Sequence, residues 1–148
     1  PERERLETQI RESGLESKVE LLGAVPLETI RREYYPRAVM LVQPSVVCDD
    51  GDQDGIPTVI IEAMAMKRPV VGSDLSGIPE VIRPGETGLL VQPGDALGLS
   101  DAMARIGEDR DRAASMGARG RQLVEERFDV RKNIEDQIRL LVRAGKVR

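Results

Sequence analysis

Asp54 and Glu62 are the two acidic residues whose spacing best suits work on a polar ligand. They stand eight residues apart, Asp54 in a glycine-containing loop and Glu62 in a helix that Pro57 is expected to open. A strand before the loop would deliver Asp54 to the edge of a sheet, and the helix would present Glu62 beside it. We therefore expect the two carboxylates to contact different parts of one extended ligand.

The start of this predicted helix offers backbone donors to an anion. The N–H groups of Thr58, Val59 and Ile60 are expected to lack partners within the first turn. A phosphate placed there would meet the positive end of the helix dipole. Gly55 lets a ligand approach the backbone closely. An anion cradle between two carboxylates suits a diphosphate with hydroxyl-rich groups on both sides, as in a nucleotide sugar.

Composition excludes several other chemistries. The 148 residues contain no His and only Cys48 as a cysteine, which excludes His-based zinc sites, His-activated nucleophiles and intrachain disulfides. Lys and Arg number 22 against 26 Asp and Glu, for a net charge of −4, and the aromatic residues are Tyr34, Tyr35 and Phe128. This acidic, aromatic-poor balance argues against nucleic acid as a partner.

Neither a bilayer-spanning apolar run nor a signal peptide is visible in the sequence. The chain begins at Pro1 rather than Met, which favours an excised fragment. The default expectation for its location is therefore the cytoplasm.

The elements that must position these residues alternate between helices and strands. We expect helices carrying Leu6 and Ile10, then Leu27, Ile30 and Tyr34, then residues 57–67 and 79–82, and finally two helices capped by Asp95 and Asp129. Strands are expected at 19–22, 38–42, 69–71 and 89–91, with 38–42 buried on both faces. This order predicts an α/β domain with a three-layer, Rossmann-like parallel sheet. Ligands of such sheets bind beyond the carboxyl ends of the strands, which directs attention to the loop after Val42.

The motifs in residues 44–91 make the hypothesis specific. They are PS, DGIP, EAMA, PVV, SGIPEVI and GETGLLV, in that order. The segment resembles the C-terminal domain of the retaining GT-B glycosyltransferases, glycosyltransferase family 4, in its bacterial exopolysaccharide-type members. The resemblance implies that residues 1–148 are a partial C-terminal, donor-binding domain of a GT-B fold, and that the acceptor-binding N-terminal domain is absent from this chain.

By the same resemblance, the full-length protein would move a sugar from a nucleotide-diphosphate sugar to a glycan or lipid-linked acceptor, with no metal or other cofactor. Asp54 would be the catalytic residue that orients the donor sugar. Six further positions would bind the donor: Glu62 the ribose hydroxyls, Gly55 and Ile56 the sugar, Thr58 and Val59 the diphosphate, and Gly23 the base.

The chain departs from the family pattern at three positions. Asp54 is one methylene shorter than the usual Glu, while Lys67 and Ser76 stand where the family usually has glycine. The family's basic pair, which neutralises the diphosphate, would lie upstream of this chain.

Three alternatives remain open on the sequence alone. The chain could be a non-catalytic nucleotide or nucleotide-sugar binding module. Residues 50–55 match the first half of an EF-hand loop, but the twelfth position is Ile61 instead of a bidentate Glu. Residues 139–148 mix apolar and basic side chains, which fits either core packing with exposed charges, the simpler account, or a peripheral contact of the full-length protein with an anionic membrane. Tyr34 and Tyr35 are expected to be packing or surface residues.

Overall fold

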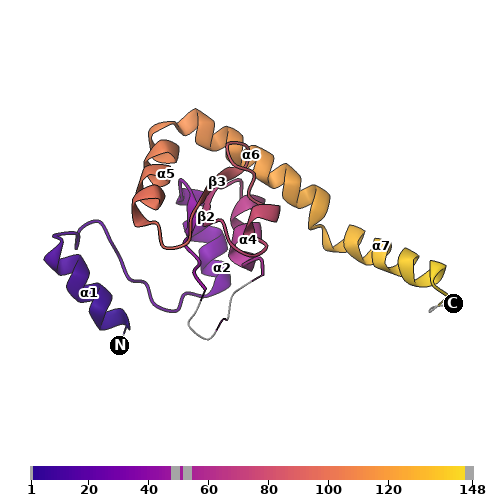
Figure 1. Ribbon diagram of the computed structural model, residues 1–148, viewed down its shortest axis with the longest axis horizontal. Coiled ribbons are helices and arrows are strands. Elements are labelled where there is room, and N and C mark those ends of the chain that lie inside the picture. Colours follow the sequence, from indigo (N-terminus) through magenta and orange to yellow (C-terminus); the bar gives the residue numbers. More distant parts are fainter. Residues whose placement is uncertain (1, 48–50, 52–54, 146–148) are drawn as a thin grey trace.

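The computed structural model describes residues 2–47, 51 and 55–145. Its sheet contains three parallel strands in the order β1 (Leu41–Gln43), β2 (Val70–Ser73) and β3 (Gly88–Val91). Val42 pairs with Val71, and Val71 pairs with Leu89. The parallel order follows from the helices that connect the strands (Figure 1).

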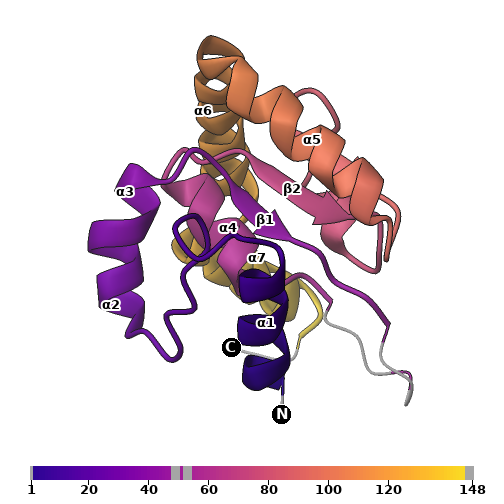
Figure 2. The same cartoon turned by 90° about the vertical axis from the view of Figure 1, so that its left-hand side faces the viewer.

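Helices cover both faces of the sheet (Figures 1 and 2). Helix α4 (Thr58–Ala65) packs on one face and α5 (Ala96–Glu108) on the other, while α6 (Arg110–Arg127) contacts both of these helices. Alternate strand residues point to opposite faces, so Val70 and Val71 of β2 belong to two different apolar clusters. The expected three-layer α/β sandwich is confirmed.

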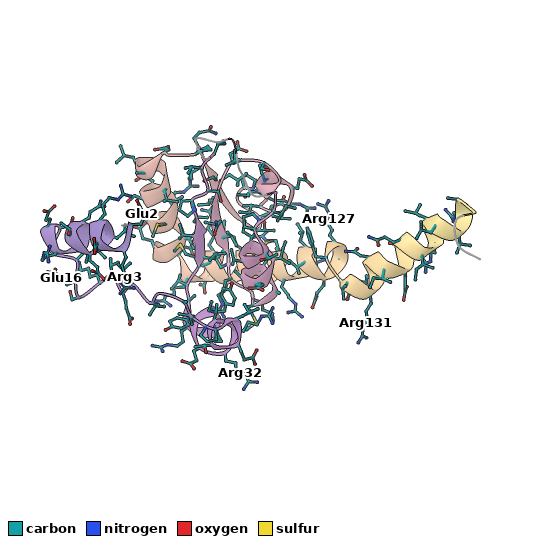
Figure 3. All side chains as sticks on the ribbon, turned by 90° about the horizontal axis from the view of Figure 1, so that it is seen from below. Glu2, Arg3, Glu16, Arg32, Arg127 and Arg131 are labelled. Carbon is teal, nitrogen blue, oxygen red and sulfur yellow. The ribbon has the colours of Figure 1, made fainter. Side chains whose placement is uncertain are left out.

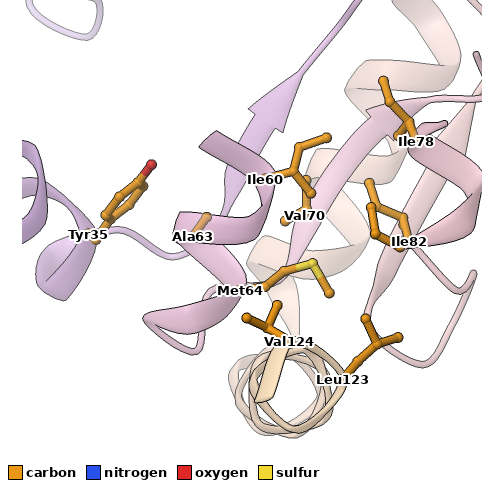
Figure 4. Packing of buried hydrophobic residues seen from close by; sticks show 10 residues of the cluster. Tyr35, Ile60, Ala63, Met64, Val70, Ile78, Ile82, Leu123 and Val124 are labelled. Atoms are coloured by element: carbon orange, nitrogen blue, oxygen red, sulfur yellow. The ribbon is translucent and has the colours of Figure 1, made fainter. Parts of the chain in front are cut away.

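The larger cluster fixes α4 against β2 and α6. Ile60 and Met64 of α4 are fully buried against Val70, Ile82 and Leu123 (Figure 4). Burial of an aliphatic side chain of this size contributes about 1.5–3 kcal/mol. The rigid seat matters because α4 carries Glu62 and the predicted anion cradle.

Aspartates start the three long C-terminal helices. The carboxylates of Asp95, Asp109 and Asp129 accept backbone N–H groups at the first turns of α5, α6 and α7 (Val130–Arg143). Hydrogen bonds from the amides of Lys132 and Arg131 hold the pKa of Asp129 below its usual range. The caps expected at Asp95 and Asp129 are confirmed.

The helix expected around Leu27 to Tyr34 runs through three segments: α2 (Leu27–Thr29), the π-helical η1 (Ile30–Tyr34) and α3 (Tyr35–Arg37). Within η1 the amide of Tyr35 donates to the carbonyl of Ile30, five residues back. Pro36 has no N–H to donate and its ring crowds the preceding turn, which accounts for the wider turn at this point.

Two strand predictions are corrected. Residues 19–22 form no strand in the described chain, and Val19 and Leu22 are exposed, because no neighbouring strand pairs with them. The strand expected at 38–42 is Leu41–Gln43 and only half-buried, because β1 is the edge of the described sheet. The short helix at 79–82 is the 3₁₀ helix η2 (Ile78–Glu80), and the strand at 69–71 is β2.

The first and last helices stand apart from the sheet (Figure 1). Helix α1 (Glu2–Glu12) is joined to the segment before Gly23 by Arg3, whose guanidinium donates to the carbonyl of Leu21 (Figure 3). Helix α7 carries the expected apolar face, but none of its residues is buried and Ile138 is 52% exposed. The core packing expected for residues 139–148 is therefore wrong for the described part of that stretch, where Leu140, Leu141 and Val142 are exposed. Within residues 2–47, 51 and 55–145, every helix is too short or too polar to cross a bilayer.

Candidate donor-binding site

Asp54, the predicted catalytic residue, lies outside the described residues. The structure begins again at Gly55, which is exposed, and continues through the half-buried Ile56 into the buried Pro57. Ile56 packs against the larger apolar cluster, which anchors this approach to α4. The segment that holds the predicted sugar contacts is therefore fixed at its helical end.

The amino end of α4 presents two of the three predicted backbone donors. Within the described residues, the N–H groups of Thr58 and Val59 have no backbone acceptor. The Ile60 amide donates to the Pro57 carbonyl at 3.0 Å, which corrects the expectation that it is free. A phosphate at this helix end would thus meet the amides of Thr58 and Val59, the two residues assigned to the diphosphate.

The loop after β2 supports the same segment from the side. The Gly77 amide donates to the Gly55 carbonyl at 3.0 Å. Ser76, one residue earlier, adopts a left-handed backbone with φ of 53°, a conformation that favours glycine. This explains in backbone terms why glycine is the usual residue at the position of Ser76.

Glu62 lies in α4 and is held by two side chains from the helix before β1. One of its carboxylate oxygens forms an ion pair with Arg31 Nη2 at 3.0 Å. The other accepts from the Tyr35 hydroxyl at 3.4 Å, and that hydroxyl also lies 3.3 Å from the Val59 carbonyl oxygen. The Glu62 side chain keeps 19% of its surface exposed, so a ligand can still reach it.

Tyr35 is buried, with 5% of its surface exposed. Burial raises the pKa of its phenol, and the negative charge of Glu62 and the hydrogen bond to that carboxylate raise this pKa further; the positive charge of Arg31 opposes them. The phenol is therefore a neutral hydrogen-bond donor at physiological pH.

Gly23 has a φ of +71° and lines a cavity of about 560 Å³ together with Val59 of α4 and with Tyr35, Ile30 and Gln43. Gly23 and Val59, which are far apart in the sequence, thus line one cavity, and the assignment of Gly23 to the base stays a prediction. A second cavity of about 550 Å³, which includes Asp74, Asp95 and Arg105, contains none of the predicted donor residues.

The expectation that Tyr35 is a packing residue is confirmed, since it belongs to the larger apolar cluster, but its contact with Glu62 was not predicted and Arg31 was not singled out. One signal was present: the two residues are four apart in a predicted helix, so they share a face. That this face meets Glu62 could not be seen, because the contact joins positions 31 residues apart (62 − 31 = 31).

The calcium-loop alternative does not fit the surrounding elements. An EF-hand loop needs a helix on each side. The element before this loop is strand β1, and only the element after it, α4, is a helix.

Comparisons with known proteins support a single family. Residues 1–109 match the sequence profile of the family described as Glycosyl transferases group 1. The chain is 38% identical over 125 residues to the amylovoran biosynthesis glycosyltransferase AmsK of Erwinia amylovora, which covers 84% of this chain and 30% of AmsK. It is also 38% identical over 130 residues to the putative colanic acid biosynthesis glycosyltransferase WcaL of Escherichia coli, with 87% of this chain and 32% of WcaL covered.

Solved structures give the same result for the fold. Sucrose-phosphate synthase from Thermosynechococcus elongatus superposes with a TM-score of 0.82 and 34% identity, over 97% of this chain and 35% of that one. Anabaena HepE, solved in complex with UDP-glucose, superposes with a TM-score of 0.80 and 26% identity, over 95% of this chain and 36% of its own. The chain therefore spans about a third of the length of these relatives.

Proposed function

The chain belongs to the group 1 glycosyltransferase family, and we propose that it is the donor-binding domain of a longer, retaining glycosyltransferase. Its fold is that of the C-terminal, Rossmann-like domain of GT-B enzymes. The observation that carries the proposal is the arrangement around α4. Thr58 and Val59, whose amides have no backbone acceptor among the described residues, begin this helix, and Glu62 follows on it with part of its carboxylate side chain exposed. Gly23 lines a cavity that Val59 also lines.

Each of these groups suits one part of a nucleotide-diphosphate sugar. The α4 amides and helix dipole would bind the diphosphate and stabilise the charge that builds on it as the sugar departs. Glu62 would accept hydrogen bonds from the ribose hydroxyls, and Gly23 would contact the base. UDP-glucose in HepE, a structural neighbour, supports a nucleotide-sugar donor.

Asp54 is proposed to orient the donor sugar, with Gly55 and Ile56 presenting their backbone to it. Holding the sugar against an acceptor supplies part of the rate by proximity. We propose that the residues around α4 bind this donor with no metal or other cofactor. The acceptor would bind on a further, N-terminal domain and would be a glycan or lipid-linked glycan, as the exopolysaccharide-forming relatives suggest. We place the enzyme in the cytoplasm, at the inner face of the membrane when the acceptor is lipid-linked.

The first test is nucleotide binding by ligand-observed NMR. The full-length protein would be titrated with UDP, GDP and ADP and with their common sugar conjugates, with Glu62→Ala as the control. We expect one nucleotide to bind, and to bind at least about tenfold more weakly to Glu62→Ala, the loss of about 1.4 kcal/mol of binding free energy. If no nucleotide binds, or if Glu62→Ala binds equally well, the assigned donor site is wrong.

The second test separates an enzyme from a non-catalytic binding module. We expect the full-length protein to transfer sugar from its donor, and Asp54→Ala to abolish transfer while retaining nucleotide binding. The isolated 148-residue chain should transfer none, because it would lack the acceptor domain. Donor binding without turnover by the full-length protein would favour the binding module.

A further inference from the structure

We propose that Arg31 and Tyr35 are positioning residues that fix the Glu62 carboxylate for a pair of ligand hydroxyls. The inference rests on the proposed function, in which Glu62 binds the ribose of a nucleotide donor. It adds two residues from a different helix to that site and assigns each to one oxygen of the carboxylate.

The contacts divide the carboxylate between its two neighbours. Arg31 Nη2 lies 3.0 Å from Oε1, and Tyr35 Oη lies 3.4 Å from Oε2. Arg31 in η1 and Tyr35 in α3 are four residues apart on the continuous helical run that leads into β1, so this one run provides both contacts. Tyr35 itself is buried, and its single hydroxyl proton is shared between Glu62 Oε2 and the carbonyl oxygen of Val59, which lies 3.3 Å away.

Counting acceptors shows what remains for a ligand. A carboxylate can accept about four hydrogen bonds. Arg31 and Tyr35 use one on each oxygen, which leaves one on each oxygen for an incoming hydroxyl. Two adjacent hydroxyls, as in the cis-diol of a ribose, match this remaining capacity. Without the two donors, the Glu62 side chain could rotate, and the pair of acceptors would no longer face the diol together.

The exposure of Arg31 indicates that its contact with Glu62 serves positioning rather than stability. The Arg31 side chain is 48% exposed, and half-exposed ion pairs contribute little to the free energy of unfolding. Replacing Tyr35 by Phe removes the hydroxyl while the buried ring stays in place. Both Arg31→Gln and Tyr35→Phe should therefore fold like the wild type, and their effect should appear in ligand binding.

The test compares two probes in the full-length protein by calorimetric titration. One probe is UDP (GDP or ADP if the wild type prefers either), and the other is the same nucleotide with a dideoxyribose, which lacks the hydroxyls that Glu62 would bind. We expect Arg31→Gln and Tyr35→Phe each to weaken binding of the ribonucleotide by about three- to tenfold. Arg31→Lys, which keeps the positive charge, should weaken it less than Arg31→Gln does. The dideoxy probe should bind to the wild type and to both variants with equal affinity.

Adding the same substitutions to Glu62→Ala separates positioning from general damage. If Arg31 and Tyr35 act through Glu62, Arg31→Gln should cause no further loss in that background. An equal loss with the dideoxy probe, or in the Glu62→Ala background, would overturn the inference. Unchanged ribonucleotide binding by Arg31→Gln and Tyr35→Phe would also overturn the inference. If Glu62→Ala still binds the ribonucleotide more weakly in that case, the proposed function stands. Failure of the wild type to bind any of the three nucleotides would instead contradict the proposed function itself.

Discussion

The amide of Gly77 donates a 3.0 Å hydrogen bond to the carbonyl oxygen of Gly55, and this bond ties the loop after β2 to the segment that precedes α4. The two backbones approach too closely for a side chain at residue 77. A Cβ there would lie 2.7 Å from Cγ1 of Ile56 and 3.0 Å from the Gly55 oxygen. Gly77 thus sets the position of the two residues proposed to face the donor sugar.

Gly77→Ala should therefore impair the donor site more than the fold. The new methyl group would push Ile56 and Gly55 away from the loop, and we expect nucleotide-sugar affinity to fall by about tenfold, or 1.4 kcal/mol. Calorimetric titration measures this loss directly. Gly107→Ala is the control, because its Cβ would meet nothing nearer than 4.0 Å. Wild-type affinity for Gly77→Ala would show that the Gly55–Gly77 contact does not shape the site.

Tyr35 provides a spectroscopic report on the Glu62 contact. The chain has two tyrosines and no tryptophan, so Tyr34→Phe leaves Tyr35 as the source of the tyrosinate absorbance. In that background, Glu62→Gln should lower the pKa of Tyr35, because it removes the negative charge that helps to raise it. Arg31→Gln should raise the pKa, because it removes the opposing positive charge. The measurement is an ultraviolet titration of the folded 148-residue chain.

The same shift has a consequence for stability at high pH. The raised pKa means that folded Tyr35 holds its proton more tightly than unfolded tyrosine does. Its contribution to stability is fully present below the ordinary tyrosine pKa of about 10 and is lost as the pH rises from there through the folded value. Tyr35→Phe should remove this component of alkaline destabilisation.

In the ultraviolet titration, shifts of the Tyr35 pKa of the same sign in Glu62→Gln and Arg31→Gln would show that the two charges do not act on Tyr35 as the contacts indicate.

The sequence was informative wherever local chemistry decides the outcome. Pro57 predicted the start of α4, and Asp95 and Asp129 predicted the starts of α5 and α7, because capping and the missing proline N–H act within one turn. The motifs around Glu62 also predicted the family. These signals need no knowledge of which segments meet in space.

The sequence was less informative wherever the structure of a segment depends on a partner that is distant in the sequence. The apolar run at 38–42 suggested a fully buried strand, yet β1 is half-buried because it lies at the edge of the described sheet. Residues 19–22 have a strand-like composition, but no strand among the described residues pairs with them. The Arg31–Glu62 contact likewise joins two helices whose packing no local pattern encodes.

Lys67 adopts a backbone conformation that its side chain disfavours. Its φ is 58°, and it directly follows Met66, the C-cap residue of α4, at the position where a left-handed glycine commonly ends a helix. Lys67→Gly should raise the free energy of unfolding by about 1 kcal/mol, because the left-handed region costs non-glycine residues about 1–2 kcal/mol. Lys67→Ala removes the same charge but keeps the Cβ and should gain nothing. Equal stability of the two variants in urea unfolding would refute the backbone explanation.

Gly117 on α6 allows that helix to pack against the end of α4. A Cβ at this position would lie 2.1 Å from the carbonyl oxygen of Lys67, a backbone atom that cannot move aside alone. Gly117→Ala should therefore lower the free energy of unfolding by about 1–3 kcal/mol, despite the better helix propensity of alanine. Gly120→Ala, on the same helix, is the matched control, because its Cβ would meet Met64 at an ordinary 3.4 Å and should be neutral or stabilising. Since α4 carries Glu62 and the anion cradle, Gly117→Ala should also weaken nucleotide binding, whereas Gly120→Ala should not. Urea unfolding and nucleotide titration of the two variants test both outcomes, and similar behaviour of the pair would contradict the close approach of α6 to Lys67.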